Sequence, residues 1–580
     1  MPMLRKALKY FFSVDTRALI LILLGTIIWS LTMVKSGLVY PFGMGFWGPN
    51  GHDGIWHIAL AESLAKGSWQ MPVFAGEAIK NYHIGFDLIL AMLHKLTFIP
   101  IVNLYFQVLP PILSILLGYF AYRFIYVWKR SHSQAFWATF FVYFGGSFGW
   151  VVTLIRNKEL GGESLFWAQQ SISTLINPPY ALSLVFLFAG LYFLHEGLKG
   201  GGAKFDKRLI LATFLFGLLL QIKVYAGILA LGGLLVAGIW RIFQRKGISL
   251  IKVFGGAVII SILIFAPVTK SVGQTFIFRP FWFLETMISD PNRFYWPRFA
   301  QAMTNYKLAG NWIKGVPAYG LAFLIFWLGN LGIRIIKVPL VFGWLGNIRK
   351  LSWTQVFLMS ITWAGGLVPV FFIQSGTSWN TIQFMYYSLV FSGILAGVIL
   401  GQWLEKQKTT LLYSIVVSAI ILLTIPTLVA TLKHYIPARP PAKISKEELE
   451  ALNFLSKEPD GVVLTQPFDK KAADDAVDNP PRPLYLYEST AYVSAFSGKP
   501  VYLEDQVNLE ITSYGWKLRR NEVERFFADP TYDGKYELLE KKGITYVYVI
   551  KNLQVQYKGL YLEPNKIFEN GEVVVYKYEI

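Results

Sequence analysis

The sequence of 580 residues contains no cysteine. Disulfide bonds, cysteine-ligated metal centres and thiolate catalysis are therefore excluded. Acidic residues are scarce as well, because only twelve of the 35 Asp and Glu residues precede residue 434. After residue 434 we find no Gly-rich phosphate-binding motif, metal-ligand cluster or nucleophile elbow. The chemistry of this chain must therefore come from a small set of carboxylates, histidines and cations.

Long apolar runs dominate the rest of the composition. The chain is 54% hydrophobic with a mean hydropathy of +0.44, which excludes an ordinary soluble domain. Most of the runs are long enough to cross a hydrocarbon core of ~30 Å. We therefore expect an α-helical polytopic membrane protein with about eleven spanning helices. The runs lie at about residues 18–35, 101–127, 133–154, 178–195, 208–221, 224–240, 250–269, 317–333, 353–373, 381–402 and 410–432.

Charge divides the chain in two. Residues 434–580 hold 19 Lys and Arg against 23 Asp and Glu, so the net charge of +19 comes from a surplus of +23 in residues 1–433. These cations lie in short connections between apolar runs, which is the positive-inside pattern and argues against nucleic-acid binding. The basic clusters fall on one side if residues 434–580 lie outside. We therefore predict a multi-pass protein of the cell membrane with an extracytoplasmic C-terminal part.

The predicted domains follow from this change in composition. Residues 1–433 form a transmembrane domain with long outer loops at 37–100 and 270–316. Residues 434–580 form an α/β domain, because a capping box at Ser445 and Glu448 opens a helix and strand-like runs follow at 461–465, 500–504, 544–550 and 572–578. Residues 82–98 are apolar but carry four ionisable side chains. We expect them to form a helix along the outer surface, since an inside N-terminus and an outside C-terminus require an odd number of crossings.

The stretch 49–62 is the strongest candidate for a site. Asp53 lies between His52 and Gly54, which places it in a turn or at a helix start. A helical pattern begins at Trp56 and ends near Gly67. The simplest structural explanation is an Asp that caps a short helix on the membrane surface. Eight of the twelve carboxylates fall on the predicted outer side, however, and four of these lie in the first loop. A carboxylate beside lipid is costly unless it is paired or functional, so this clustering favours an outer site.

Cations on the same side complement these acids. In residues 270–316 Arg residues alternate with aromatic residues, a pattern that suits an amphiphile with an anionic head such as a lipid phosphate. An interfacial aromatic belt with cations that reach to the headgroups is the structural alternative. We take Asp53 as the candidate catalytic base. The candidate substrate-binding residues are His52, His57, Glu62, His83, Asp87, Glu163, Lys223, Arg279, Arg293 and Arg298.

The order of these features resembles the GT-C superfamily of polyprenyl-phosphate-dependent glycosyltransferases. The shared features are a basic N-terminus, one span, a long outer loop with an early acid and a juxtamembrane helix, many further spans and an outer α/β domain. The resemblance implies that Asp53 takes the place of the first-loop acid. It also implies that residues 82–87 lie where many members have a His-Pro-Pro helix start. This chain departs from that pattern, since Gly54 follows Asp53 and no proline follows His83.

Three functions fit these observations. The first is a hexosyl- or pentosyltransferase that moves a sugar from a polyprenyl-phosphate donor to a hydroxyl of a glycan, lipid or protein acceptor. His52 or His57 would orient Asp53, and Glu62 or Glu163 would hold sugar hydroxyls or a divalent metal such as Mg or Mn, which nothing in the sequence demands. The second is a lipid or polysaccharide transporter or flippase, which predicts charges within the spans and related halves. The third is a non-catalytic membrane scaffold, which leaves the acids of the first loop unexplained.

Overall fold

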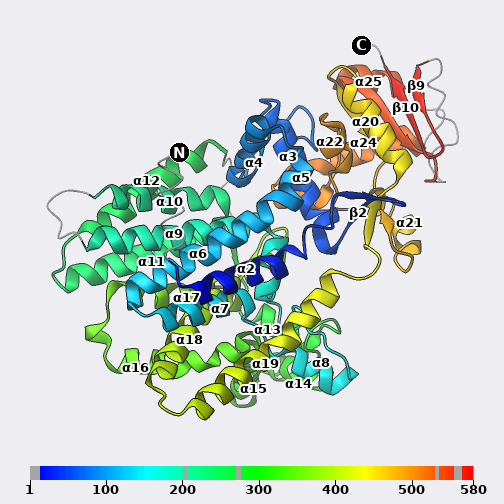
Figure 1. Ribbon diagram of the computed structural model, residues 1–580. Coiled ribbons are helices and arrows are strands. Elements are labelled where there is room, and N and C mark those ends of the chain that lie inside the picture. The colour runs from blue at the N-terminus through cyan, green and yellow to red at the C-terminus, as the bar shows by residue number, and fades with distance from the viewer. Residues whose placement is uncertain (1–13, 200–205, 269–275, 529–533, 554–564, 579–580) are drawn as a thin grey trace. The chain divides into compact units, whose positions relative to one another are not determined.

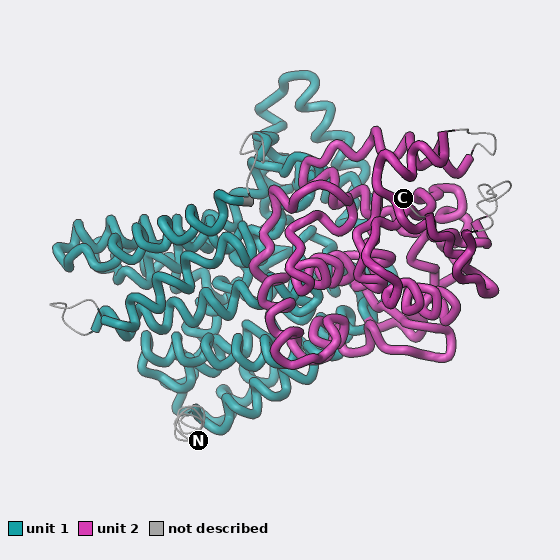
Figure 2. The backbone as a smooth tube through the Cα atoms, turned by 90° about the horizontal axis from the view of Figure 1, so that it is seen from above, with its two compact units in different colours: residues 1–31, 111–267, 272–435 teal, residues 32–110, 268–271, 436–580 magenta. Residues whose placement is uncertain are grey.

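A computed structural model describes residues 14–199, 206–268, 276–528, 534–553 and 565–578. The chain divides into two compact units (Figure 2). The first comprises residues 1–31, 111–267 and 272–435, and the second comprises residues 32–110, 268–271 and 436–580. The expected domain boundary at residues 433 and 434 lies beside the break at residue 435. The second unit also contains the predicted outer loop 37–100, which was expected to belong to the membrane domain.

The first unit is a bundle of helices (Figure 1), and each of the eleven apolar runs lies in or largely overlaps a helix of this unit. One short antiparallel pair, β3 (Phe276–Phe278) with β4 (Phe372–Gln374), accompanies them. The α-helices of this unit are α2 (Thr16–Ser30), α6 (Leu109–Lys129), α7 (His132–Phe144), α8 (Gly149–Asn157), α9 (Pro178–Leu198), α10 (Lys207–Ile222), α11 (Val224–Phe243), α12 (Ser249–Phe265), α13 (Trp282–Ser289), α14 (Pro297–Leu308), α15 (Trp312–Leu331), α16 (Val338–Gly346), α17 (Trp353–Phe371), α18 (Ile382–Lys406) and α19 (Thr410–Tyr435).

Helix length bears directly on the number of spans. Among the described residues seven helical segments are long and apolar enough to cross a membrane, and α7 with α8, bent by 46°, makes an eighth if the pair is one span. The remaining three runs form the shorter helices α2, α10 and α12, of 15, 16 and 17 residues. A helix of that length spans only about 24 Å. The chain is a multi-pass membrane protein by these criteria, and eleven crossings stay a prediction.

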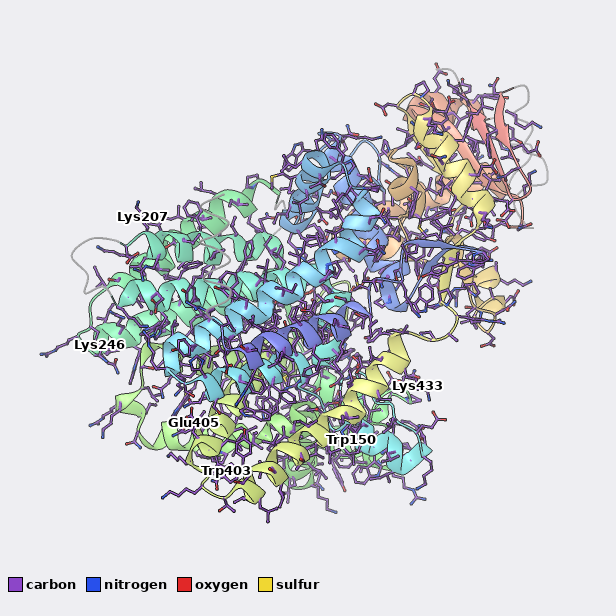
Figure 3. The ribbon with its side chains drawn as sticks, in the orientation of Figure 1. Trp150, Lys207, Lys246, Trp403, Glu405 and Lys433 are labelled. Atoms are coloured by element: carbon purple, nitrogen blue, oxygen red, sulfur yellow. The ribbon has the colours of Figure 1, made fainter. Side chains whose placement is uncertain are left out.

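The ends of the bundle differ in the residues that they carry. Lys207, Lys246 and Glu405 lie towards one end of the first unit, whereas Trp150 and Lys433 lie towards the other (Figure 3). Lys207 begins α10, Lys246 follows α11 and Glu405 ends α18, so three connections that the sequence places in the cytoplasm share one end. This arrangement agrees with the alternation of basic clusters, and the side on which residues 434–580 lie stays a prediction.

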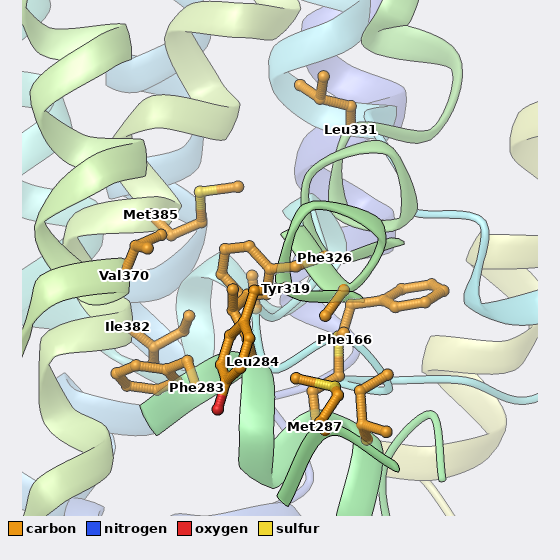
Figure 4. Packing of buried hydrophobic residues seen from close by; sticks show 14 of the residues in the cluster. Phe166, Phe283, Leu284, Met287, Tyr319, Phe326, Leu331, Val370, Ile382 and Met385 are labelled. Atoms are coloured by element: carbon orange, nitrogen blue, oxygen red, sulfur yellow. The ribbon is translucent and has the colours of Figure 1, made fainter. Parts of the chain in front are cut away.

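A hydrophobic cluster fixes the predicted loop 270–316 to the bundle (Figure 4). Phe283, Leu284 and Met287 of α13 are fully buried against residues of α15, α17 and α18. Burying a side chain of this size contributes roughly 1.5–3 kcal/mol. The inward-facing aromatic residues of this segment therefore form a protein core, and the interfacial pattern expected from the sequence stays a prediction for exposed ones such as Tyr295 and Trp296.

The second unit joins the first loop to the C-terminal residues. Its mixed sheet has the order β1-β2-β5-β7, in which β2 pairs antiparallel with β5 so that Met44 lies opposite Ile444. A second sheet has the order β6-β8-β10-β9. The strands are β1 (Leu38–Tyr40), β2 (Gly43–Phe46), β5 (Ala442–Ile444), β6 (Val462–Thr465), β7 (Arg482–Pro483), β8 (Ile544–Ile550), β9 (Lys566–Glu569) and β10 (Val573–Lys577).

The helices of this unit lie in both parts of its sequence. The capping box expected at Ser445 and Glu448 is present and opens α20. The surface helix expected at 82–98 is α4, whose 13 residues span about 20 Å, too short for a core of ~30 Å. The helices are α3 (Asp53–Ala65), α4 (Gly85–Thr97), α5 (Ile101–Asn103), α20 (Lys446–Lys457), α21 (Lys470–Asp475), α22 (Tyr492–Ser497), α23 (Gln506–Ile511), α24 (Trp516–Ala528) and α25 (Lys535–Lys542).

Candidate functional site

The position of Asp53 depends on two glycines that allow close packing. Helix α3 begins at Asp53, one residue after its N-cap His52, so Asp53 is the first helical residue and not the cap that the simplest explanation proposed. A Cβ on Gly54 would lie 2.8 Å from the ring of Phe106. A Cβ on Gly51 would lie 2.9 Å from that of Ala442 in β5. The turn that carries Asp53 can therefore lie directly against the C-terminal part of its own unit.

Asp53 and His52 form an accessible pair. His52 Nδ1 lies 2.9 Å from Asp53 Oδ1, and the two side chains are 34% and 50% exposed. Burial lowers the pKa of His52, but the hydrogen-bonded Asp53 carboxylate and the nearby Asp505 together raise that pKa above its ordinary value. A carboxylate that is oriented and open to a ligand is suited to accept a proton.

Asp505, from the C-terminal part of the second unit, lies near the His52–Asp53 pair. The sequence alone does not single out this residue. Asp505 is the N-cap of α23 and has φ +50°, a left-handed conformation that is uncommon for a residue other than glycine. Its Oδ1 accepts from Asn508 N at 3.1 Å and from Ser489 Oγ at 3.3 Å. Burial raises the pKa of Asp505 to about 6, although these hydrogen bonds and the charge of His52 oppose the rise. Arg482 also acts electrostatically on His52, where it lowers the pKa.

A second pair, His57 and Asp87, is buried. His57 Nδ1 lies 2.7 Å from Asp87 Oδ1, with the side chains 6% and 0% exposed. The ring of His57 stacks on Tyr105 with centroids 5.9 Å apart, and Tyr82 and Phe86 enclose it further. This pair joins α3 to the first turn of α4. The structure thus brings together two residues that the sequence nominated separately, in a place where they position helices and have little access to a ligand.

The remaining candidates in the second unit are His83 and Glu62. His83 stacks on Tyr82 with ring centroids 4.5 Å apart. Glu62 is nine residues after Asp53, about 13 Å along α3. Burial raises the pKa of Glu62, and the charges of His94 and Lys66 oppose that rise. Glu62 therefore belongs to a different patch of the helix from the His52–Asp53 pair.

In the first unit Glu163 and Lys223 hold elements together. Glu163 Oε1 accepts from Gln170 N and Ser173 Oγ, both at 3.1 Å, and its Oε2 accepts from Thr431 Oγ1 of α19 at 2.9 Å. Burial raises the pKa of this carboxyl. Lys223 lies in the extended break between α10 and α11 and donates to Asn177 Oδ1 at 3.4 Å.

The three candidate arginines differ in their surroundings. Arg293 lies 3.9 Å from the ring centroid of Trp167, donates through Nη1 to Ser164 O at 2.8 Å and faces Asp290 at 4.0 Å. Its guanidinium is thus held within the fold, although its buried Nε has no hydrogen-bond partner among the described residues. The side chains of Arg279, beside β3, and Arg298, in the first turn of α14, are exposed. These two are the better placed to bind an external anion.

The described residues around Asp53 offer no evident set of ligands for a divalent metal. In the residues that the structure describes, no group of three or more His, Asp or Glu side chains is arranged to hold an ion. Asp53 contacts the His52 side chain, and Asp505 accepts hydrogen bonds from the side chains of Ser489 and Asn508. We therefore derive no catalytic step through a metal.

Glu504, next to Asp505, makes the stability of the second unit sensitive to pH. It accepts from Val493 N at 2.8 Å and Ser494 N at 3.1 Å, and burial raises its pKa to about 8. Because the folded state holds this proton more tightly than the unfolded state, stability is greatest below pH ~4.5 and declines as the pH rises towards 8. We expect the melting temperature of the purified chain to fall over this range.

Glu504→Gln should flatten that decline, because the amide does not ionise. The exposed Glu537→Gln variant, measured in the same buffers, is the matched control and should keep the wild-type slope. A wild-type melting temperature that is constant between pH 5 and pH 8 would contradict the assignment.

Similarity to known proteins is found among solved structures. No family model matches the sequence, and no curated protein matches it. Among solved structures it is similar to the Archaeoglobus fulgidus oligosaccharyltransferase bound to an inhibitory peptide and a dolichol-phosphate, at 12% identity and TM-score 0.48, over 92% of this chain and 69% of the other. The same enzyme with Zn and sulfate matches at 12% identity and TM-score 0.49, over 91% and 68%.

Proposed function

We propose that this chain is a membrane glycosyltransferase that moves a sugar from a polyprenyl-phosphate-linked donor to an acceptor hydroxyl at the outer face. The observation that carries the proposal is the half-exposed Asp53 carboxylate, held by His52 at 2.9 Å at the start of a helix in the first outer loop. This is where the resemblance to the GT-C superfamily expects the acid. The chemistry also needs cations for the departing phosphate, and Arg279 and Arg298 are exposed.

The proposed reaction uses Asp53 as the base. The acceptor oxygen attacks the anomeric carbon, the bond from that carbon to the phosphate oxygen breaks, and the lipid phosphate leaves with the electron pair. The hydroxyl proton passes to the Asp53 carboxylate, which His52 orients. Removing the proton as the bond forms raises the nucleophilicity of the oxygen, and a guanidinium stabilises the charge on the phosphate. His57 and Asp87 act on this step only by positioning α3.

The test is transfer by the purified full chain, with polyprenyl-phosphate hexoses and pentoses as donors and release of the polyprenyl phosphate as the readout. Arg279→Lys or Arg298→Lys, at the true phosphate ligand, should raise the donor KM by about tenfold, because lysine keeps the charge but loses the forked donors. Arg293→Lys should instead lower the melting temperature, since it removes the packing on Trp167. Release of lipid phosphate that none of the three Arg→Ala variants changes would exclude the donor assignment.

The same assay distinguishes a transporter from a glycosyltransferase. Arg334 and Lys337 are buried in the first unit, with Arg334 Nη2 3.2 Å from Ser171 Oγ and Lys337 Nζ 2.6 Å from Ser392 Oγ. Buried cations inside a helical bundle are the feature that the transporter hypothesis predicts. A donor that crosses the membrane of a proteoliposome with its sugar–phosphate bond intact would favour that function, whereas cleavage of the bond favours the transferase.

A further inference from the structure

The C-terminal part of the second unit contains a cavity of about 500 Å³, within the ~300–1,000 Å³ that is usual for small-molecule sites. Its wall combines cations, carboxylates, an amide and aromatic rings. Its polar and aromatic lining residues include Asp474, Arg482, Glu488, Gln506, Trp516 and Arg520. They come from α21, β7, α23, α24 and the connection after β7.

Two buried donors in this wall lack partners. Arg520 donates through Nη2 to Phe468 O at 2.7 Å and through Nε to Glu524 at 2.5 Å, but its buried Nη1 has no hydrogen-bond partner in the described structure. The Arg482 guanidinium lies 3.7 Å from the ring centroid of Tyr487, and its buried Nε is likewise unpaired among the described residues. A buried donor without a partner is unfavourable, so both atoms require oxygen acceptors on a ligand.

The other residues of the wall narrow the class of ligand. Trp516 is half-buried and its Nε1 donates to Glu510 Oε2 at 2.8 Å, so its ring orientation is fixed and what it offers a ligand is its apolar surface. Asp474 and Glu488 add carboxylates that accept hydrogen bonds, and Gln506 can both donate and accept. To satisfy all of these groups, a ligand must have hydroxyl groups that both donate and accept hydrogen bonds, together with an apolar C–H face. That description fits a saccharide, whereas a simple anion would make no use of the aromatic surface of Trp516 or of the carboxylate acceptors.

The cavity also lies near the proposed base. Gln506 of its wall follows Asp505, and Asp505 and Arg482 both act electrostatically on His52. Ser489, which donates to Asp505, follows Glu488 of the wall. All of these residues belong to the same compact unit as Asp53. A sugar bound in the cavity would therefore lie close to the carboxylate that is to receive its proton.

We propose that this cavity is the acceptor site of the enzyme and that the acceptor which it binds is a saccharide, stacked on Trp516 and hydrogen-bonded by Arg482 and Arg520. The role of the cavity in sugar transfer rests on the proposed function. The binding of a saccharide, however, can be measured without any turnover.

The experiment measures saturation transfer by NMR from the detergent-purified full chain to the methyl glycosides of glucose, mannose, galactose and N-acetylglucosamine. At least one glycoside should bind to the wild type and to Asp53→Asn. Trp516→Ala should weaken that binding by at least about fivefold, whereas Trp516→Phe should retain most of it. Trp69→Ala removes an exposed tryptophan elsewhere in the same unit and should have no effect.

Glu488→Gln serves as a second variant at an exposed position, in case Trp516→Ala lowers the melting temperature, and should also weaken binding. Three results would overturn the proposal: no glycoside binds, Trp516→Ala and Glu488→Gln both bind as the wild type does, or inorganic phosphate displaces the glycoside and binds better to Glu488→Gln. Transfer to a lipid or peptide hydroxyl without glycoside binding would refute the saccharide site alone. Glycoside binding without any transfer would refute the proposed function and leave the site in place.

Discussion

Asp53→Asn is expected to lower the turnover of sugar transfer by a factor of ~10² or more while the fold stays intact. Asparagine has nearly the same size, and its Oδ1 can still accept the hydrogen bond from His52 Nδ1 that the structure shows at 2.9 Å. Only the capacity to take up the acceptor proton is lost. The measurement is kcat on the lipid-linked donor, together with the melting temperature of each protein.

The control for this prediction lies on the same helix. Glu62→Gln makes the same chemical change nine residues further on, about 13 Å along α3, and should act on KM more than on kcat. His52→Ala should give an intermediate loss, because it removes the group that orients the carboxylate and keeps the carboxylate itself. Near-normal turnover in Asp53→Asn would leave Asp53 as the acidic first-turn residue of α3, where it interacts with the helix dipole.

The helices could be predicted because hydropathy is a local property. The run expected at 178–195 is α9 (Pro178–Leu198), and Asn177 Oδ1 caps it by accepting from Tyr180 N at 3.0 Å, as expected for a cap before two prolines. The start of α3 was likewise readable from the glycines around Asp53. Local spacing did not reveal that α13 would bury Phe283 and Leu284 in the protein core, since an inward-facing aromatic and a lipid-facing one share the same composition.

The surroundings of the His52–Asp53 pair could not be predicted, because they depend on pairing across about 400 residues. The first loop meets the C-terminal domain through β2 and β5, where Gly45 lies opposite Lys443. No periodicity in either segment specifies that register. Asp505 and Arg482 reach the vicinity of His52 only through this fold.

The burial of two cations could not be predicted for a related reason. Arg334 and Lys337 belong to a basic cluster that the positive-inside pattern places on the cytoplasmic side, and both side chains are buried and donate to neutral oxygens. A count of charges in a connection does not report which of them turn inward. The pattern predicts the side of the membrane for the cluster and not the surroundings of each member.

The buried His57–Asp87 pair predicts the largest effect on stability. Asp87 is 0% exposed and its Oδ1 lies 2.7 Å from His57 Nδ1. Asp87→Ala should lower the free energy of unfolding of the second unit by about 3–5 kcal/mol, because it leaves the imidazole buried without its acceptor and opens a cavity between α3 and α4. Asp87→Asn keeps an acceptor oxygen and should cost less. Thermal unfolding of the full chain gives the comparison.

The double variant decides whether the pair also positions Asp53. His57→Leu with Asp87→Leu replaces both partners by apolar groups and should recover part of the stability, as expected when two buried polar groups are removed together. His57 lies one helical turn after Asp53, on the same face of α3, so the pair sets the rotation of the helix and with it the direction of the carboxylate. Turnover in the double variant should therefore remain low even where stability returns. If turnover recovers in step with stability, the pair only stabilises the packing of α3 against α4, and the orientation of Asp53 depends on His52.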